Sequence, residues 1–582
     1  MFSQYNRFMS AIKIQRYQET TNHEVSVFDR VLNARGVKHA NEVNYQLNAL
    51  LPPSALSGID QAAELLSEAV QADAKIVIVG DFDADGATSC ALAMVALRMF
   101  GLQNVSYLVP NRFEFGYGLS PEIVGVAAAE QPDVIITVDN GISSIDGVNA
   151  AQALGISVIV TDHHLPGEQL PTADVIINPN LAHDQFPSKN LAGVGVIFYV
   201  MLALRAKLRS QSWFQQAQIA EPNMSQFLDL VALGTVADVV PLDHNNRILV
   251  QQGLQRIRAG LARPGITALL QVAKKDFRYI AASDLGFSVG PRLNAAGRMD
   301  DMSVGIECLL ANDLTIATRL AQSLDELNKT RREVEDGMRE EAIERVKALD
   351  VKSSKNAVGY CLHDKTWHQG IVGLVASRVK DRVKRPVAAM APADITKPEG
   401  EWKGSLRSVE GVHIRDVLAR VDALNPGLMD KFGGHAMAAG LSIEHGKIDA
   451  FSVAFDMALK EMTEGMDWQQ MIMSDGELAD HEFNLELAEQ LRYATPWGSG
   501  FVAPLFDGYF EVCDARIVGD SHAKMVLRPQ DSDDSYDAIC FGYLRDHEHL
   551  PRGIIHGAYR LDVNHYQGMK KLQLMIEHIV SS

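Results

Sequence analysis

The sequence has few cysteines and too little positive charge to balance its negative charge. Its five cysteines, Cys90, Cys308, Cys361, Cys513 and Cys540, lie far apart and form no C-x-x-C pair. This spacing argues against a disulfide framework and a thiolate zinc site, so we expect reduced core residues. With 54 Lys and Arg against 73 Asp and Glu, the formal net charge is -19. Such a surface repels phosphodiester backbones, so a nucleic-acid substrate would need a local basic groove or bound cations.

Long hydrophobic runs are also absent. No apolar run reaches the ~20 residues that a membrane span requires, and the first ten residues lack the pattern of a secretory signal. We therefore expect a soluble cytoplasmic protein without membrane contact, and we find no internal repeat or low-complexity tract. The 582 residues, 47% of them apolar, exceed the roughly 250 to 300 residues over which one core grows, which predicts three or four domains.

Changes of pattern along the chain predict an α/β protein. Residues 1–60 form a polar extension that suits packing on a surface. In residues 61–313, β-branched runs at 76–79, 134–138, 158–160 and 175–177 alternate with amphipathic stretches, which predicts a largely parallel sheet. Residues 314–349 have helical spacing and predict a long helix that bridges two domains. A smaller α/β domain is expected at 350–465 and a small β-barrel at 470–582.

Three closely spaced carboxylates follow the first predicted strand. Asp81, Asp83 and Asp85 are expected on a single loop, where they would repel one another. Hard divalent cations such as Mg²⁺ or Mn²⁺ relieve that repulsion and prefer carboxylate oxygen. For this segment alone, a solvated acidic turn or a calcium loop is the alternative.

Two later strands also end in polar residues. One is followed by Asp139, and the next by Asp162, His163 and His164. Because the carboxyl ends of parallel strands face the ligand crevice, we expect these groups to converge with the first three carboxylates. A helix cap and surface histidines are the ordinary alternatives, and the joint placement disfavours both.

Asp238 lies in an otherwise apolar run. A buried lone carboxylate is costly unless it is paired or metal-bound, and helix capping or an ion pair is the alternative. The cluster would then offer enough ligands for two cations roughly 3.5 to 4 Å apart, an arrangement that suits phosphoester hydrolysis. The expected ligands are Asp83, Asp85, Asp139, His163 and Asp238.

These segments resemble successive motifs of the DHH phosphoesterase superfamily. The motifs are Gly80–Ser89, Val138–Ser143, Asp162–His164 and Asp238. Gly290–Arg298 and Phe432–Gly440 further resemble the RecJ family, whose members are single-strand-specific 5′→3′ exonucleases. The resemblance covers nearly the whole chain after residue 60. It implies a DHH domain, a DHH-associated domain and a C-terminal oligonucleotide-binding (OB) barrel.

The resemblance also implies roles for single residues. Two Mn²⁺ or Mg²⁺ ions would be held by the five ligands above, and His164 would contact the scissile phosphate. The catalytic set would be Asp139, His163, His164 and Asp238. Many family members have a histidine ligand where this chain has Val79, so Asp81 or water would compensate.

Several residues are expected to hold the nucleic-acid strand near the cations. Arg112 could reach a phosphate, with an ion pair to Glu114 as the alternative. Arg292 and Arg298 are expected to flank a short loop that contains Asn294, where small neighbours allow a backbone to approach. A guanidinium binds phosphate bidentately, so one of these arginines is the candidate for the terminal 5′ phosphate.

The two other domains offer further candidates. Gly434 and His435 could present backbone amides to a phosphate, with a glycine-rich turn as the alternative, and Ser405 and Arg407 are further candidates. His368 is expected to be structural. In the barrel, the candidate DNA contacts are Trp497, Arg528, Tyr543 and Lys570, although aromatic residues also belong to cores.

The sequence thus predicts a metal-dependent exodeoxyribonuclease that removes nucleotides from the 5′ end of single-stranded DNA. One rival is a DHH enzyme that cleaves short RNA or cyclic dinucleotides, which would not need the long helix and the barrel. Another is a non-catalytic DNA-binding scaffold, which the intact Asp-His-His motif disfavours. The resemblance implies a role in DNA recombination and repair beside a RecQ-type helicase and the single-strand-binding protein.

Overall fold

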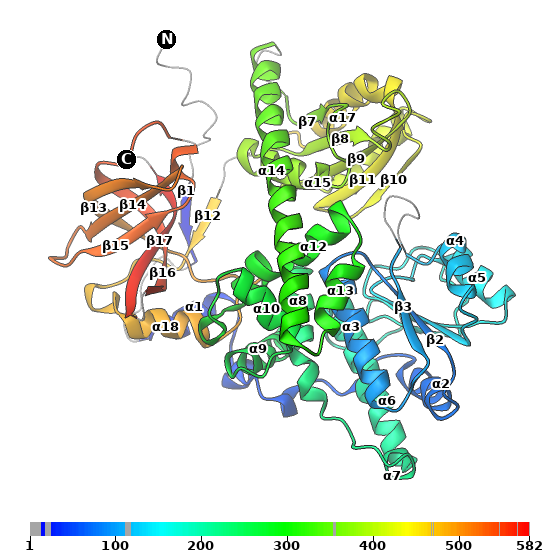
Figure 1. Cartoon of the computed structure of the whole chain (residues 1–582). Coiled ribbons are helices and arrows are strands. Elements are labelled where there is room, and N and C mark those ends of the chain that lie inside the picture. The colour runs from blue at the N-terminus through cyan, green and yellow to red at the C-terminus, as the bar shows by residue number, and fades with distance from the viewer. Residues whose placement is uncertain are drawn as a thin grey trace. The chain divides into compact units, whose positions relative to one another are not determined.

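The computed structural model describes residues 13–17, 25–110, 118–352, 357–466, 468, 471–545, 547–566 and 569–580. The chain forms two compact units (Figure 1). The larger contains Ile14–Asn328 and Met473–Ser582, and the other is built on Lys329–Ile472. None of the helices in these ranges has the length and apolarity to cross a membrane.

A parallel five-stranded sheet of order β3-β2-β4-β5-β6 lies in the larger unit. Its strands are β2 (Ile76–Gly80), β3 (Val105–Leu108), β4 (Val134–Val138), β5 (Ser157–Thr161) and β6 (Val175–Ile177). Every residue of β2 and β4 is buried, as expected when helices cover both faces of a parallel sheet. The strands predicted from the sequence are confirmed.

Alternation along β2 sends its side chains into two cores. Ile76 and Ile78 join the core formed with α2 (Ile59–Gln71), α3 (Ala84–Met99) and α6 (Gly193–Ser210). Val77 and Val79 join the opposite core, which contains residues of α4 (Pro121–Ala128) and α5 (Ile145–Ala153). Helices therefore cover both faces of the sheet, and the carboxyl ends of the strands remain available for a functional site.

A helical region follows α6. Its helices are α7 (Trp213–Gln216), α8 (Leu228–Ala237), α9 (His244–Arg258), α10 (Pro264–Val272), α11 (Ala282–Asp284), α12 (Gly290–Met299) and α13 (Ser303–Leu310). A π-helical turn, Leu285–Val289, leads directly into α12. The short loop expected around Asn294 is therefore wrong. Pro291 suits the first turn of a helix, and Ala295 and Ala296 are strong helix formers.

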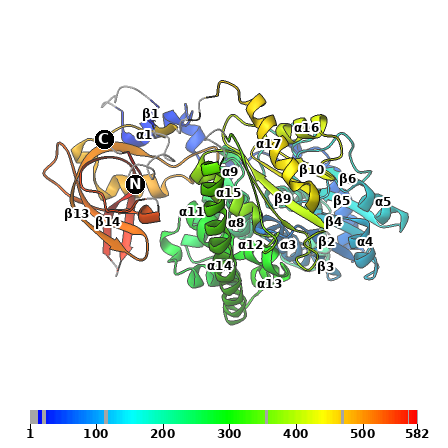
Figure 2. The same ribbon diagram turned by 90° about the horizontal axis from the view of Figure 1, so that it is seen from above.

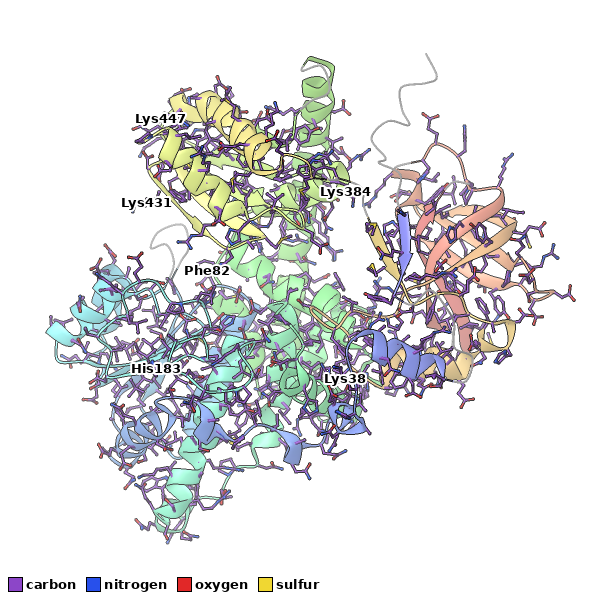
Figure 3. All side chains as sticks on the ribbon, turned by 180° about the vertical axis from the view of Figure 1, so that it is seen from behind. Lys38, Phe82, His183, Lys384, Lys431 and Lys447 are labelled. Carbon is purple, nitrogen blue, oxygen red and sulfur yellow. The ribbon has the colours of Figure 1, made fainter. Side chains whose placement is uncertain are left out.

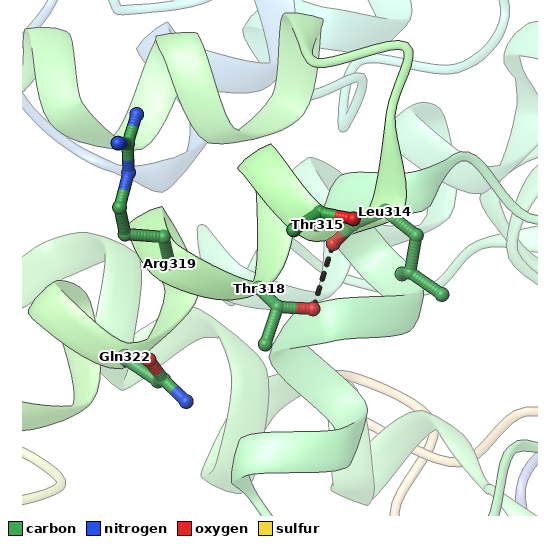
Figure 4. Close-up of a pocket in the computed structure, with 5 residues that line it drawn as sticks. All are labelled: Leu314, Thr315, Thr318, Arg319 and Gln322. Carbon is green, nitrogen blue, oxygen red and sulfur yellow. Dashed lines mark hydrogen bonds between the residues drawn. The ribbon is translucent and has the colours of Figure 1, made fainter.

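The long helix predicted at residues 314–349 is confirmed as α14 (Leu314–Lys352). Its first half contributes Ala317, Ala321 and Leu324 to the core of the larger unit, and the division between the units falls after Asn328. A hollow of about 480 Å³ lies on its first turns, lined by Leu314, Thr315, Thr318, Arg319 and Gln322 (Figure 4). The Thr318 hydroxyl there donates to the Leu314 carbonyl at 2.7 Å.

The second unit has a mixed sheet of order β10-β11-β9-β8-β7. Its strands are β7 (Tyr360–His363), β8 (Val387–Pro392), β9 (Glu401–Arg407), β10 (Lys431–Gly434) and β11 (Ala438–Glu444). Only β7 and β8 pair in parallel. Helix α15 (Val372–Val383) packs on β8 and β9. Helices α16 (Ile414–Leu424) and α17 (Ile448–Met462) contribute to the hydrophobic core of this second unit (Figure 2).

The closed barrel near the C-terminus has the order β13-β14-β15-β17-β16. Its strands are β13 (Phe506–Val518), β14 (His522–Pro529), β15 (Tyr536–Cys540), β16 (Gly553–Tyr566) and β17 (Met569–Val580), preceded by α18 (Leu485–Tyr493). The barrel predicted from the sequence is confirmed.

The N-terminal extension contributes to the barrel instead of forming only a surface layer. Strand β1 (Lys13–Arg16) pairs with β12 (Met471–Ser474), and α1 (Val27–Ala34) places Val27 and Val31 in the barrel core. Arg35 donates to Asp475 at 2.9 Å in a buried ion pair. The five cysteines are free thiols, and Cys513 is exposed, contrary to the expectation that all lie in cores.

Candidate metal centre

Three neighbouring strands of the parallel sheet end in polar residues. Asp81 follows β2, Asp139 follows β4, and Asp162, His163 and His164 follow β5. Because the three strands are adjacent and parallel, their carboxyl ends meet at one edge of the sheet. The convergence expected from the sequence is confirmed.

The sequence predicted that the three aspartates share one loop. This prediction is wrong, because two of them stand at the start of helix α3 and only Asp81 precedes it in the loop. Asp83 is the N-cap residue, and its carboxylate accepts from the N–H of Asp85 at 2.9 Å. Asp85 lies in the first turn, where its carboxylate accepts from Gly193 N–H at 2.6 Å and Val194 N–H at 3.0 Å. Aspartate is a favoured N-cap residue. The same carboxylate can therefore start the helix and stand beside the other possible metal ligands. Backbone donors therefore fix the orientation of both side chains.

Two glycines bring helix backbones against these carboxylates. A Cβ at Gly193 would lie 2.5 Å from the Cβ of Asp139, and a Cβ at Gly234 would lie 2.7 Å from Oδ1 of Asp85. Asp139 itself has a φ of 62°, in the left-handed region. Helices α6 and α8 can thus approach as they do only because both positions lack a side chain.

The possible ligand atoms form three overlapping groups. Within each group, all of the ligand atoms lie within 4.8 Å of one another. The groups are Asp81 with Asp83 and Asp139, Asp85 with His163 and Asp238, and Asp139 with His163 and His164. The Nε2 atom of His163 lies 3.1 Å from Asp139 Oδ1 and 3.4 Å from Asp238 Oδ2. This nitrogen is buried without a hydrogen bond. A ring nitrogen facing two carboxylates fits a shared divalent cation.

Burial and crowding shift the pKa values of the cluster. Burial, followed by the charge of Asp83, raises the pKa of Asp85 to about 7. Burial and the charge of Asp85 also raise the pKa values of Asp139 and Asp238. Burial, with a contribution from His164, lowers the pKa of His163 to about 4, which leaves a neutral imidazole able to act as a ligand. Bound cations would remove the repulsion among these carboxylates.

His164 is oriented by Asp162. Its Nδ1 lies 2.7 Å from Asp162 Oδ1, and the other carboxylate oxygen accepts from Ile142 N–H at 2.9 Å. Burial works against protonation, but the Asp162 contact outweighs it and raises the pKa of His164. The side-chain amide of Asn178 holds the His164 carbonyl at 2.8 Å. The contact with Asp162 therefore favours the protonated ring of His164.

The arginines expected near the metal centre differ in their surroundings. The Nε of Arg292 donates to Asp325 Oδ1 at 2.9 Å, and its Nη1 donates to the Ser288 carbonyl at 2.5 Å. Arg292 is thereby tied to α14 and to the turn before α12. Arg298 lies in the last turn of α12. Arg112 lies outside the described residues.

Asn294 accepts a hydrogen bond from the metal-binding segment. Its Oδ1 is 2.8 Å from the backbone nitrogen of Ala84, between Asp83 and Asp85. Phe82, labelled in Figure 3, lies on the same segment. Sequence reasoning placed Asn294 on the substrate and missed this contact, because it assumed a loop where the chain forms α12.

Ser405 and Arg407 are neighbours on β9 in the second unit. A Cβ at Gly373 of α15 would lie 2.9 Å from Arg407 Nη2 and 3.2 Å from Ser405 Oγ. Gly434, with a φ of 144°, is the last residue of β10.

The expected availability of the His435 backbone amide is wrong. In the turn between β10 and β11 this N–H already donates to the Ala438 carbonyl at 2.8 Å. The His435 residue is exposed, so its side chain could still meet a ligand. The Nδ1 of His368 accepts from Gly370 N–H at 3.2 Å, which agrees with a structural role.

The candidate contacts in the barrel are engaged within the fold. Trp497 stacks on Phe501 at a ring distance of 5.1 Å, and Tyr543 stacks on His547 at 4.0 Å. Arg528 pairs with Glu511, and Lys570 pairs with Glu489 at 2.6 Å. The two aromatic residues therefore have packing roles, as the alternative for them proposed.

Family models match three segments of the chain. They are the DHH family N-terminal domain at residues 75–235, the DHHA1 domain at 354–461 and the RecJ OB domain at 474–578. The chain is 52% identical over 553 residues to the single-stranded-DNA-specific exonuclease RecJ of Dickeya dadantii (strain 3937), covering 94% of this chain and 95% of the relative. Identity and coverage are the same for the RecJ protein of Escherichia coli (strain K12). The crystal structure of RecJ in complex with Mn²⁺ from Thermus thermophilus matches with a TM-score of 0.77 at 26% identity, covering 96% of this chain and 76% of that one.

Proposed function

The chain belongs to the RecJ family of the DHH phosphoesterases, and we propose that it releases mononucleotides from the 5′ end of single-stranded DNA. It is a metal-dependent exonuclease specific for single strands, with a role in DNA recombination and repair. The observation that carries this function is the convergence of five aspartates and a neutral histidine beyond three adjacent strands. Phosphoester hydrolysis is the chemistry that such a cluster supports.

The cofactor is a pair of Mn²⁺ or Mg²⁺ ions. We assign as their ligands Asp81, Asp83, Asp85, Asp139, His163 and Asp238. When bound, the two ions lower the pKa of a water molecule and neutralise charge on the phosphoryl oxygens. The assignment rests on the overlap of the groups, because Asp139 belongs to two of them and can bridge. Val79 is buried in the core and offers no ligand, so Asp81 takes its place in the proposal.

His164 acts on the scissile phosphate in this proposal. Its contact with Asp162 favours the protonated ring, which can donate to a non-bridging oxygen. Asp162 and Asn178 hold the ring and its backbone, so little reorganisation is needed when charge develops on the phosphate. Asp139, His163 and Asp238 complete the catalytic set.

The strand is held by cationic and small residues in the proposal. Arg112 and Arg298 contact phosphates near the cations, and Arg292 would do so only through the guanidinium N–H groups that Asp325 and the Ser288 carbonyl do not take, while Ser405 and Arg407 bind a phosphate in the DHH-associated domain. Support for the second site comes from the shared position of these two side chains beneath Gly373. Gly434 and the His435 side chain would border this phosphate.

The three matched segments support a division of the chain by function. We propose an N-terminal extension at 1–60, a DHH domain at 61–313, a bridging helix at 314–349, a DHH-associated domain at 350–465 and an OB domain at 470–582. Single-stranded DNA is the substrate. We further propose action in the cytoplasm, beside the single-strand-binding protein and a RecQ-type helicase, since repair by a 5′ exonuclease requires unwound DNA.

The test is digestion of an oligonucleotide labelled at its 5′ or its 3′ end, with Mn²⁺ or with chelator. Immediate release of a labelled mononucleotide from the 5′-labelled strand, only with Mn²⁺, is the expected result. Cleavage of dinucleotides with the long strand intact would instead indicate an enzyme for short substrates. A protein that binds the strand and cleaves neither substrate would be a scaffold.

A further inference from the structure

Helix α12 contacts two of the elements that deliver the proposed ligands, α8 and the β2–α3 connection. Near its start, a Cβ at Gly290 would lie 3.1 Å from the Cβ of Ala237, the residue before Asp238. Near its end, a Cβ at Gly297 would lie 1.7 Å from the carbonyl oxygen of Phe82, the residue before Asp83. One helix therefore spans the distance between α8 and the β2–α3 connection, with no side chain at either contact.

Asn294 adds a specific hydrogen bond to this contact. It lies three residues before Gly297, on the same face of α12. Its Oδ1 accepts from the N–H of Ala84, the first residue of α3. The first N–H groups of a helix have no acceptor within the helix, so the carboxamide satisfies a donor that would otherwise lack one. This bond fixes the turn on which Asp83 and Asp85 stand.

The helix is itself anchored. Arg292 donates to Asp325 of α14 at 2.9 Å and to the Ser288 carbonyl at 2.5 Å. Leu293 is fully buried in the core of the larger unit. Because α12 is held on its far side, it can act as a rigid support for the ligands on its near side.

We propose that α12 is a spacer that sets the separation between the cation ligand of α8 and those of α3, with Asn294 as its positioning residue. The inference rests on the proposed metal site. Asn294 acts through the backbone of Ala84 and contacts neither cation nor DNA. This role replaces the substrate contact that the sequence suggested for Asn294.

The first test measures Mn²⁺ binding without DNA, by electron paramagnetic resonance of the free ion. The variant Asn294→Ala should bind Mn²⁺ about 10- to 100-fold more weakly, the usual loss when a residue that orients metal ligands is removed. Excess Mn²⁺ should restore kcat, and the KM for DNA should not change. Equal Mn²⁺ affinity in Asn294→Ala and the wild type would overturn the proposal.

The variant Asn294→Asp distinguishes positioning from substrate contact. It retains an oxygen that can accept from Ala84, so its Mn²⁺ affinity should stay at or above that of the wild type. If Asn294 instead contacted a phosphate, the added charge would repel DNA and raise KM more than Asn294→Ala does. That result would overturn the proposal.

Asn484→Ala is the matched control. The Oδ1 of Asn484 accepts from Leu487 N–H at 2.8 Å at the start of α18, so the substitution removes the same kind of bond elsewhere. It should lower the melting temperature without changing Mn²⁺ affinity. If the wild type fails to bind Mn²⁺, the proposed metal site itself is wrong. If the wild type binds Mn²⁺ and Asn294→Ala binds it equally well, only the role of α12 is wrong.

Discussion

The parallel sheet and the mixed sheet carry side chains of opposite charge. At the edge of the parallel sheet, Asp81, Asp85 and Asp139 are 5%, 1% and 2% exposed and repel one another. On the mixed sheet, Ser405 and Arg407 offer donors from a half-buried strand. Burying like charges destabilises the fold, and a protein retains such a cluster where cations and chemistry require it. Substitutions in the first region should therefore lower kcat, and those in the second should raise KM.

The largest expected effect follows from Asp139→Asn. Asparagine tolerates the left-handed φ of 62° at this position, so folding should be preserved. Loss of the proposed bridging carboxylate should lower kcat on the order of 10³-fold or more, because the cations then lose their common ligand. Single-turnover digestion at saturating Mn²⁺ measures the loss, and circular dichroism checks the fold. Turnover within tenfold of the wild type would contradict the bridging role.

The next effect is smaller and should fall on KM. Arg407→Ala removes a proposed phosphate contact, and a hydrogen bond to a charged group contributes about 1.5 to 3 kcal/mol, or roughly 10- to 100-fold in binding. We expect KM for DNA to rise by that factor while kcat stays unchanged. The control is Arg420→Ala, which breaks an exposed pair with Glu461 in the same unit. Equal changes in the two variants would remove Arg407 from the binding site.

The same comparison explains what the sequence could predict. Strand ends are visible because buried β-branched runs stop at polar residues, so the edge that gathers Asp139 and His163 was predictable. The position of Asp85 inside α3 was not predictable, since the N-cap Asp83 that precedes the helix looks like a loop aspartate in the sequence. The helix α12 was missed because its glycines suggested a loop, whereas they serve close contacts with Ala237 and Phe82. Such contacts form only in the tertiary structure, so the role of these glycines could not be predicted from the sequence.

A third expected effect is on stability and its dependence on pH. Because folding raises the pKa of Asp85 from its ordinary value to about 7, the folded state holds protons that the unfolded state releases. In chelator, this carboxylate's contribution to stability therefore falls as pH rises from about 4 to about 7. Asp238→Asn removes one neighbouring charge and should melt at a higher temperature than the wild type.

The advantage of Asp238→Asn should grow from pH 5 to pH 8 in chelator, by a few degrees. Added Mn²⁺ should reverse the order, because the cation stabilises the wild type more than the variant. Thermal melts with and without Mn²⁺ provide the measurement. A difference that is independent of pH would mean that the repulsion among these carboxylates does not govern stability.

The smallest effect is expected in the barrel, which belongs to neither region of the comparison. Arg528 is paired with Glu511 on the surface, so a phosphate must compete with that carboxylate for the guanidinium. If Arg528→Ala removes one phosphate contact, the slope of log affinity against log salt should fall by about 0.7, and affinity about two- to threefold. The control Arg209→Ala breaks an exposed pair between Arg209 of α6 and Glu221, and it should leave the slope unchanged. We expect kcat to remain at the wild-type value in both variants. A loss of kcat in Arg528→Ala would show that the barrel influences the chemical step, which would contradict the division between binding and catalysis.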